Sequence, residues 1–214
     1  MARITGSNGE RTAEAIRQAA IRLIHRQGFA AMNLRELAAE VGIQPGSLYN
    51  HIQTKQGLLF ELMQEHMQDL LSAMEAALAA APAEPMAQLR AFLAQHVLYH
   101  LERKQEVYIA NFELRALEKA NAEPILAMRR AYENRLIGLL EEGARAGKLQ
   151  VADTRIAAYA LLAMLTGVCT WYRPGGRLSP EEIVAQHLEL ALNGVSAAAF
   201  ECDTTVLPAT LGQA

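Results

Sequence analysis

The sequence predicts an all-α protein of about nine helices. Apolar residues recur at steps of three and four along most of the 214-residue chain, and no run alternates convincingly with the period of two that strands show. Residues that cap helices interrupt this pattern at regular points, and Asn33, Thr54, Asp153 and Ser179 each precede a helical run.

The first three helices are short and closely spaced. An apolar face ends at Gly28, a residue suited to a left-handed helix end. Asn33, with Glu36 three residues later, predicts the start of a second helix that ends at Gly42. Pro45 fits the first position of a third helix of about two turns, because a proline there sacrifices no hydrogen bond.

The remaining helices are longer. Thr54 caps a helix that continues to the break at residues 82–85, and Pro124 is expected to start another helix that ends at Gly147. The motif Ser-Pro-Glu-Glu at 179–182 is a strong start signal, because the serine and the second glutamate can cap reciprocally. The other expected helices cover residues 86–101, 107–117 and 156–172, and the last one covers 179–193.

Composition excludes several classes of protein. A content of 51% hydrophobic residues is too high for a disordered chain, and two cysteines cannot form a disulfide framework. The start of the chain lacks the apolar core of a signal peptide, and the apolar stretch 156–171 is shorter than the span of about 20 residues that a bilayer requires. We therefore expect a cytoplasmic protein without a membrane segment.

Charge is distributed unevenly between the two parts of the chain. The net charge is −3, but residues 1–55 hold seven Lys and Arg against four Asp and Glu, a balance of +3. The remainder therefore carries −6. This asymmetry indicates that any polyanion is held by the first quarter of the chain.

Residues 34–52 have the pattern of two helices that meet at a tight turn. Apolar side chains form a seam on one side of both helices, at Leu34, Leu37, Val41, Ile43, Leu48 and Ile52. Outside this seam lie the hydrogen-bonding residues Gln44, Ser47, Tyr49, Asn50 and His51, as in a helix-turn-helix that enters a major groove. An ordinary helical hairpin with a polar outer face would have the same spacing.

Residues 11–63 resemble the DNA-binding domain of the tetracycline-repressor (TetR/AcrR) family of bacterial transcription regulators. The segment GFAAMNLRELAAEVGIQPGSLYNHIQTKQGLL aligns with it without a gap. The resemblance implies an arm at 1–9, a DNA-binding domain at 10–57, a ligand-binding and dimerisation domain at 58–195 and a tail at 196–214. The implied DNA-binding residues are Asn33, Arg35, Gln44, Pro45, Gly46, Ser47, Tyr49, Asn50, His51 and Lys55, with Tyr49 and Lys55 mainly on phosphates.

The family also implies a homodimer formed through the last two helices of the body. The small and adaptable residues of 156–172 fit this role, although a buried monomer core would have a similar composition. A two-fold symmetric operator favours the dimer.

The C-terminal part resembles the branch of the family that answers to acyl-coenzyme A thioesters from fatty-acid, aromatic or steroid breakdown. The resemblance rests on FELRAL at 112–117, on AYENRL at 131–136 and on residues 165–183. An acyl-CoA needs an apolar channel and cations, and the cation candidates are Arg115, Arg129, Arg130, Arg135 and Arg173. The predicted ligand-binding set is Phe92, His96, His100, Tyr108, Phe112, Arg115, Tyr132 and Met164, although core packing explains the aromatic residues equally well.

Two other interpretations were weighed against this one. His96 and His100 lie four residues apart and could bind a metal, but two ligands do not make a site, so a hydrogen-bonded interior pair is favoured over a metal centre or other cofactor site. A helical metal-dependent enzyme would use these histidines with Glu113, yet no nucleophile and base converge at a recognisable spacing. The closer alternative is a repressor of an efflux pump that senses bulky apolar drugs.

Overall fold

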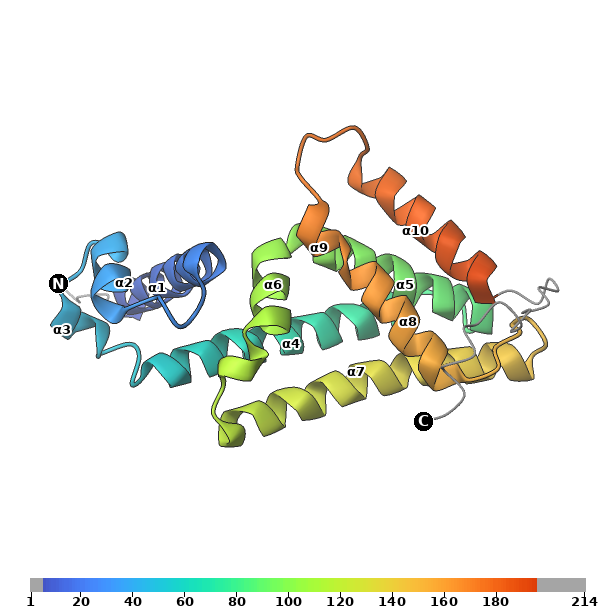
Figure 1. Ribbon diagram of the computed structural model, residues 1–214, viewed down its shortest axis with the longest axis horizontal. Coiled ribbons are helices and arrows are strands. Elements are labelled where there is room, and N and C mark those ends of the chain that lie inside the picture. The colour runs from blue at the N-terminus through green and yellow to red at the C-terminus, as the bar shows by residue number, and fades with distance from the viewer. Residues whose placement is uncertain (1–5, 196–214) are drawn as a thin grey trace, which may run out of the picture.

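In the computed structural model, which describes residues 6–195, every regular element is a helix (Figure 1). The first three helices form one end of the molecule, and the long helix α4 connects them to the body. The elements are α1 (Gly6–Gln27), α2 (Leu34–Val41), α3 (Pro45–Leu48), α4 (Lys55–Ala80), α5 (Pro85–Glu102), α6 (Lys104–Phe112), the 3₁₀ turn η1 (Leu114–Ala116), α7 (Lys119–Arg145), α8 (Thr154–Thr166), α9 (Val168–Trp171) and α10 (Pro180–Val195).

The predicted helix ends are confirmed by their capping hydrogen bonds. The amide of Gly57 donates to the hydroxyl of Thr54 over 2.8 Å, and Asp153 accepts from two amides at the start of α8. Ser179 and Glu182 form the full reciprocal box, with distances of 2.8 and 3.2 Å. These bonds satisfy donors that a helix leaves free at its N-terminus.

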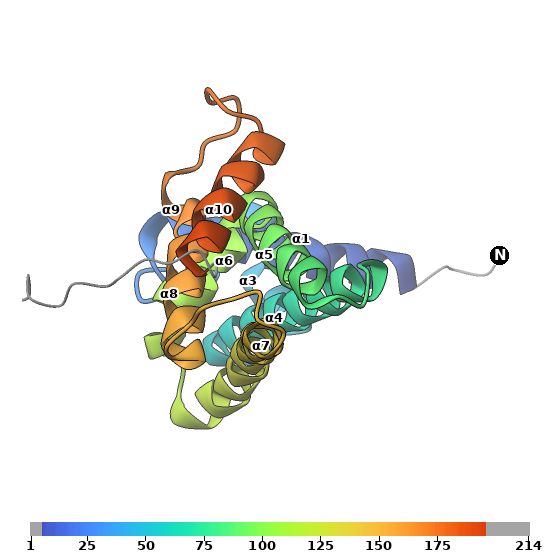
Figure 2. The ribbon, with the colours of Figure 1, turned by 90° about the vertical axis from the view of Figure 1, so that its right-hand side faces the viewer.

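The body is built around α4, α5 and α7, which pack against one another. α8 and α10 lie on the same flank and both contact α5 (Figure 2). α6 crosses between the body and the N-terminal unit, where it contacts α1 as well as α4. One continuous core of buried apolar side chains therefore extends from α1 to α10.

Several predicted boundaries were wrong. α7 begins five residues before Pro124, which lies inside the helix, because a proline this close to the N-terminus removes only one backbone hydrogen bond. Residues 6–9, assigned to the arm, are the first turn of α1; residues 1–5 and the predicted tail at 196–214 lie outside the described residues.

Three other differences concern α6, α8 and α3. The helix expected at 107–117 runs instead from Lys104 to Phe112 and continues as η1. The helix expected at 156–172 divides at Gly167, a residue of low helix propensity whose carbonyl accepts the hydroxyl of Thr170 over 2.8 Å. α3 is also shorter than expected, with a single turn.

Candidate functional site

The first candidate site is the helix-turn-helix formed by α2 and α3. Asn33 caps α2 by accepting the amide of Glu36 over 2.9 Å, and Gly42 ends α2 in the left-handed conformation with φ of 76°. The second bond of the predicted capping box, from the backbone amide of Asn33 to the Glu36 carboxylate, is not formed. That carboxylate instead accepts from the side chains of Gln27 and Arg26 of α1. The turn is thus fixed at both ends and braced against α1.

The apolar seam beneath the turn is confirmed. Leu37, Ala38 and Leu48 are completely buried, and Ile52 is nearly so. The other seam residues, Leu34, Val41 and Ile43, are partly buried against the same core. Because this side of α2 and α3 is closed, the polar residues between them must face outward.

All the predicted DNA-binding residues are at least partly exposed. Tyr49 follows α3 and is 59% exposed, although its neighbour Leu48 is fully buried. Lys55 is half-buried at the start of α4, and His51 is half-buried in the turn before it. The others are exposed on α2, on α3 and in the turns beside them: Asn33, Arg35, Gln44, Pro45, Gly46, Ser47 and Asn50.

Lys55 is held in place rather than free. Its Nζ donates to the carbonyl of Ala30 over 3.2 Å and lies 4.4 Å from the ring centre of Phe29. Burial lowers the pKa of Lys55, and the Glu113 carboxylate opposes this shift. The ammonium group is therefore oriented at the N-terminus of α4, where backbone amides also attract anions.

Part of the basic charge of this domain is neutralised within it. Arg22 pairs with Glu40 over 3.1 Å, and Arg26 pairs with Glu36 over 3.3 Å. These exposed pairs join α1 to α2 and contribute little to stability singly. Arg35 forms no ion pair with any residue that the structure describes, so it remains available to a phosphate.

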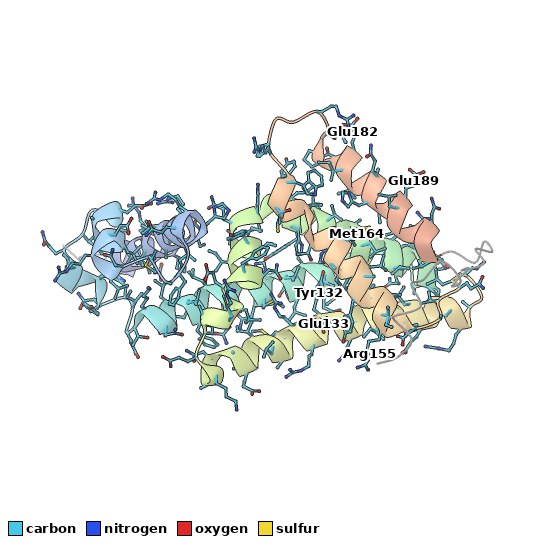
Figure 3. The ribbon with its side chains drawn as sticks, viewed as in Figure 1. Tyr132, Glu133, Arg155, Met164, Glu182 and Glu189 are labelled. Atoms are coloured by element: carbon cyan, nitrogen blue, oxygen red, sulfur yellow. The ribbon has the colours of Figure 1, made fainter. Side chains whose placement is uncertain are left out.

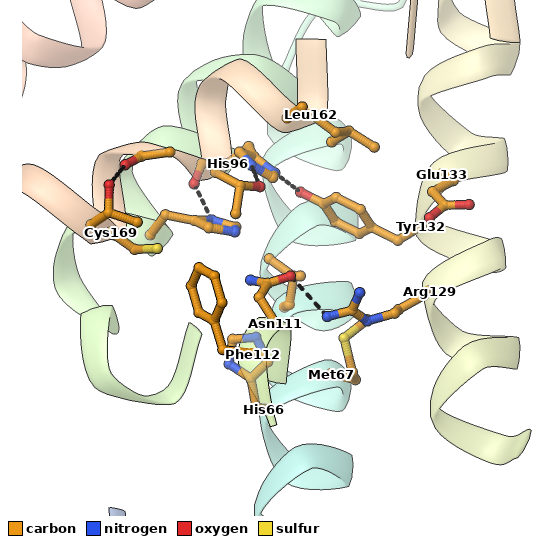
Figure 4. A pocket seen from close by; sticks show the side chains of 16 residues that line it. His66, Met67, His96, Asn111, Phe112, Arg129, Tyr132, Glu133, Leu162 and Cys169 are labelled. Carbon is orange, nitrogen blue, oxygen red and sulfur yellow. Dashed lines mark hydrogen bonds between the residues drawn. The ribbon is translucent and has the colours of Figure 1, made fainter. Parts of the chain in front are cut away.

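The second candidate site is a cavity of about 350 Å³ in the body (Figure 4). It lies among α4 to α9, and this volume is at the lower end of the range for ligand pockets. Its apolar wall includes Met67, Leu70, Phe112, Leu162 and Ala163. The polar lining residues are His66, His96, His100, Asn111, Arg129, Tyr132, Glu133, Thr166 and Thr170.

The two predicted histidines form a stacked, hydrogen-bonded pair inside this cavity wall. The ring centres of His96 and His100 are 3.8 Å apart. The two nitrogens of His96 contact the hydroxyls of Tyr132 and Thr166 at 3.0 and 3.1 Å. Burial lowers the pKa of His100 to about 4 and that of His96 well below its usual value, so both rings are neutral at pH 7.

Arg129 is the one cationic side chain among the described residues that line this cavity. Its Nη2 donates to the carbonyl of Ala110 over 2.6 Å and to Oδ1 of Asn111 over 2.8 Å. Its Nε is enclosed without a partner, and burial lowers the pKa of Arg129. A buried guanidinium that lacks an ion pair favours a ligand with an oxygen acceptor.

Four of the eight predicted ligand-binding residues line the cavity: His96, His100, Phe112 and Tyr132. The other four do not. Phe92 is fully buried behind Tyr132, and Tyr108 packs on His25 of α1. Arg115 lines another hollow, which borders Phe112 and Leu126. Met164 is 38% exposed on the side of α8 away from Tyr132 (Figure 3).

The position of these four residues outside the cavity has a common cause. Periodicity identifies the apolar side of a helix but not which part of that side borders a cavity. Polar lining residues such as His66, Asn111 and Thr166 were not predicted for the same reason, since helical spacing does not show which polar residues border a cavity. The one available signal was the position of His66 on an apolar stripe.

The end of α6 connects the cavity to the DNA-binding domain. Phe112 lines the cavity, and the next residue, Glu113, accepts the amide of Phe29 at the end of α1 over 3.2 Å. Gln56 of α4 donates to the carbonyl of Ala116 over 2.8 Å and accepts the amide of Glu118 over 3.2 Å. Glu113 thus belongs to the domain junction. The enzyme hypothesis required Glu113 to lie beside His96 and His100, and it does not.

Comparison with known proteins assigns the family. The model of bacterial regulatory proteins of the tetR family matches residues 16–62, and the model of the tetracyclin repressor-like C-terminal domain matches residues 82–195. The chain belongs to the TetR family of transcriptional regulators, and it is a regulator, not an enzyme. This confirms the resemblance seen in the sequence.

Individual relatives agree with this assignment. The chain is 26% identical to the transcriptional repressor KstR2 of Rhodococcus jostii, over 90% of this chain and 94% of the relative. A tetR-family regulator from Rhodococcus RHA1 superposes with a TM-score of 0.81 at 30% identity, over 88% of this chain and 98% of that one. AibR, solved in complex with isovaleryl coenzyme A and operator DNA, has a TM-score of 0.77 at 27% identity, over 84% and 97%.

One segment of the body also has the composition of a membrane span. Residues 154–171 are long and apolar enough, and 28% of this segment is buried within the chain. Its exposed side chains include Ile156 and Tyr159 of α8 and Trp171 of α9. Asp153 caps the segment, and Gly167 divides it into α8 and α9.

Proposed function

We propose that this regulator is a homodimeric repressor that binds a palindromic operator through α2 and α3 and is released by an acyl-CoA thioester. The observation that carries the proposal is the physical connection of the cavity to the DNA-binding domain through α4 and the end of α6. Binding of chromosomal DNA places the protein in the cytoplasm.

The acyl-CoA is supported by the cavity and by the similarity to AibR, whose complex contains both isovaleryl coenzyme A and operator DNA. A cavity of about 350 Å³ accommodates an acyl group, whereas the charged phosphates of coenzyme A remain in water outside it. Arg129 is positioned to donate to an oxygen of the bound part. KstR2 and a fatty acid metabolism regulator from Bacillus subtilis are among the relatives, which favours an effector from lipid or steroid breakdown.

The homodimer is supported by the apolar side chains that α8 and α10 leave uncovered. Ile156 of α8 is 67% exposed and Leu190 of α10 is 65% exposed. The two helices lie on the same flank of the body (Figure 2). An apolar area of this kind marks an interface when it is continuous. A second copy placed on this flank would bury it and set two recognition helices for successive major grooves.

Release from DNA follows from the shared elements. α4 carries Met67 and Leu70 on the cavity and Lys55 at the DNA end, about 18 Å away at 1.5 Å per residue. A ligand that displaces Phe112 also moves Glu113 and its bond to Phe29. If the ligand binds more tightly to a dimer whose recognition helices are wrongly spaced for the operator, operator affinity falls by the ratio of the two ligand affinities.

The test is fluorescence anisotropy with labelled DNA from upstream of the protein's own gene, at fixed salt. Isovaleryl-CoA, longer-chain acyl-CoAs and ring-bearing acyl-CoAs are then titrated, with free coenzyme A as the control. We expect tight binding that one thioester reverses and that coenzyme A alone leaves unchanged. Binding that no thioester affects would contradict the effector and turn the search to the apolar drugs of an efflux repressor; absence of specific DNA binding would contradict the operator.

A further inference from the structure

His100 presents one ring nitrogen to the cavity as a hydrogen-bond acceptor. Its Nδ1 lies 2.6 Å from the backbone carbonyl of His96, and a carbonyl can only accept. Nδ1 therefore carries the proton. Because the ring is buried and neutral, Nε2 holds a lone pair and no proton.

This Nε2 has no protein partner. No residue in the described range 6–195 forms a hydrogen bond with it, although His100 is only 3% exposed. The atom is not sealed in the core, because Arg129 Nε is the single enclosed polar side-chain atom without a partner in the described part of the chain. His100 lines the cavity, so Nε2 is reached from there.

The stacked neighbour differs in this respect. Both ring nitrogens of His96 are occupied, by the hydroxyls of Tyr132 and Thr166. The pair therefore leaves one acceptor for a ligand, at His100. The hydrogen bonds from Tyr132 and Thr166 fix the orientation of the His96 ring. Because His100 is stacked on that ring, its orientation is restricted as well.

An apolar ligand in this cavity would displace water from Nε2 and leave a buried acceptor unpaired. A site with such an acceptor therefore discriminates strongly against an analogue that lacks the matching donor. This discrimination is stronger than that of an apolar pocket against one added methyl group. The cavity already holds one charge of each sign, on Arg129 and Glu133, so a charged donor is not required and would have to be desolvated. A neutral hydroxyl group meets both conditions.

We propose that the ligand of this cavity carries a hydroxyl group that donates to Nε2 of His100, so that the effector is a hydroxylated acyl or ring compound rather than a plain hydrocarbon chain. This inference rests on the proposed function in one respect, the role of the cavity as the effector site. Arg129 holds an acceptor oxygen of the same ligand.

The test compares two probes of nearly equal shape, 1-naphthol and 1-methylnaphthalene, by calorimetric titration of the full chain at pH 7.5. We expect the wild type to prefer 1-naphthol. In His100→Phe, which keeps a stacked ring but loses the acceptor, we expect this preference to fall by at least about fivefold, the factor for one net hydrogen bond. His187→Phe is the matched control, since His187 also donates to the carbonyl four residues earlier but lies outside the cavity.

A second measurement avoids any variant. In protein labelled with ¹⁵N-histidine, 1-naphthol should shift a ring nitrogen that has the lone pair of an Nε2 acceptor, and 1-methylnaphthalene should not. The inference is overturned if His100→Phe keeps the preference, if only His66→Phe loses it, or if 1-naphthol does not bind the wild type. Neither probe contains coenzyme A, and no DNA is present. A negative result with the probes is therefore distinguishable from a failure of acyl-CoA to release the operator.

Discussion

Tyr49 and Leu48 are neighbours with opposite roles, because Leu48 closes the apolar seam and Tyr49 projects into solvent. Tyr49→Ala should therefore weaken operator binding without unfolding the domain. We expect a loss of about 3- to 10-fold, as for one net hydrogen bond, and a similar factor on every operator sequence, because a phosphate contact carries no base information. Anisotropy titrations on two unrelated operators measure both quantities.

Lys55 provides a sharper test of phosphate contact because it is charged. Lys55→Gln should reduce the slope of log affinity against log salt by about 0.9, the value for one released counterion. Lys148→Gln removes the same charge at the far end of α7, where the residue is exposed, and should leave the slope unchanged. Equal slopes in the two variants would show that Lys55 serves only to hold the loop at Ala30.

The three interior histidines make the protein sensitive to acid. Burial lowers the pKa of His66 to about 3 and that of His100 to about 4, whereas the unfolded chain takes up protons near 6.5. Because the pKa of each histidine is lower in the folded protein than in the unfolded chain, the free energy of unfolding decreases as pH falls below 6.5. The decrease between pH 7.5 and 5 is about 2 kcal/mol per histidine. Urea unfolding at pH 7.5, 6 and 5 checks this. His100→Phe should show a shallower pH dependence than the wild type, and an equal dependence would contradict the assignment.

Two glycines of α7 should respond oppositely to the same substitution. A Cβ on Gly143 would lie 2.5 Å from Cδ1 of Leu149 after the turn, whereas a Cβ on Gly138 meets nothing within 4 Å. Gly138→Ala should stabilise the protein by about 0.5–1 kcal/mol through helix propensity. Gly143→Ala should be net destabilising by about 1 kcal/mol, because overpacking exceeds that gain. Thermal unfolding measures both. The cost of Gly143→Ala should be smaller in a Leu149→Ala background than in the wild type, because the side chain that the new Cβ meets is then absent.

At the scale of the element, sequence reasoning succeeded where a local signal decides the structure. The caps at Asn33, Thr54, Asp153 and Ser179 and the left-handed glycines at 28 and 42 depend on hydrogen bonds within a few residues, so the residue types alone predict them. The start of α7 and the division at Gly167 are set by residues whose local preference is weak, because Pro124 lies inside α7 and Gly167 separates α8 from α9. A helix can either end at such a proline or glycine or continue through it, so the sequence pattern alone gave wrong boundaries.

The candidate sites divide in the same way. The DNA-binding surface is one continuous segment, so its residues share a surface once the apolar seam is identified. The cavity draws on six helices, and which side chains meet there depends on how those helices cross. His96 and His100 were found because they lie one turn apart, whereas Asn111 and Arg129, which are bonded to each other, come from different helices.

At the scale of the whole molecule, the exposed apolar flank predicts the assembly. Ile156→Glu together with Leu190→Glu places two charges where a partner copy would bury apolar side chains. We expect this variant to sediment as a monomer and to lose most of its operator affinity, because one helix-turn-helix contacts only a half-site.

Leu126→Glu is the matched control for this change. Leu126 is also an exposed apolar residue, but it lies on α7, outside α8 and α10, so the variant should remain a dimer and bind the operator as the wild type does. Sedimentation velocity with and without operator DNA distinguishes the cases. A double variant that still sediments as a dimer would assign the interface to another surface, and the exposed apolar residues of α8 and α10 would then need a different partner.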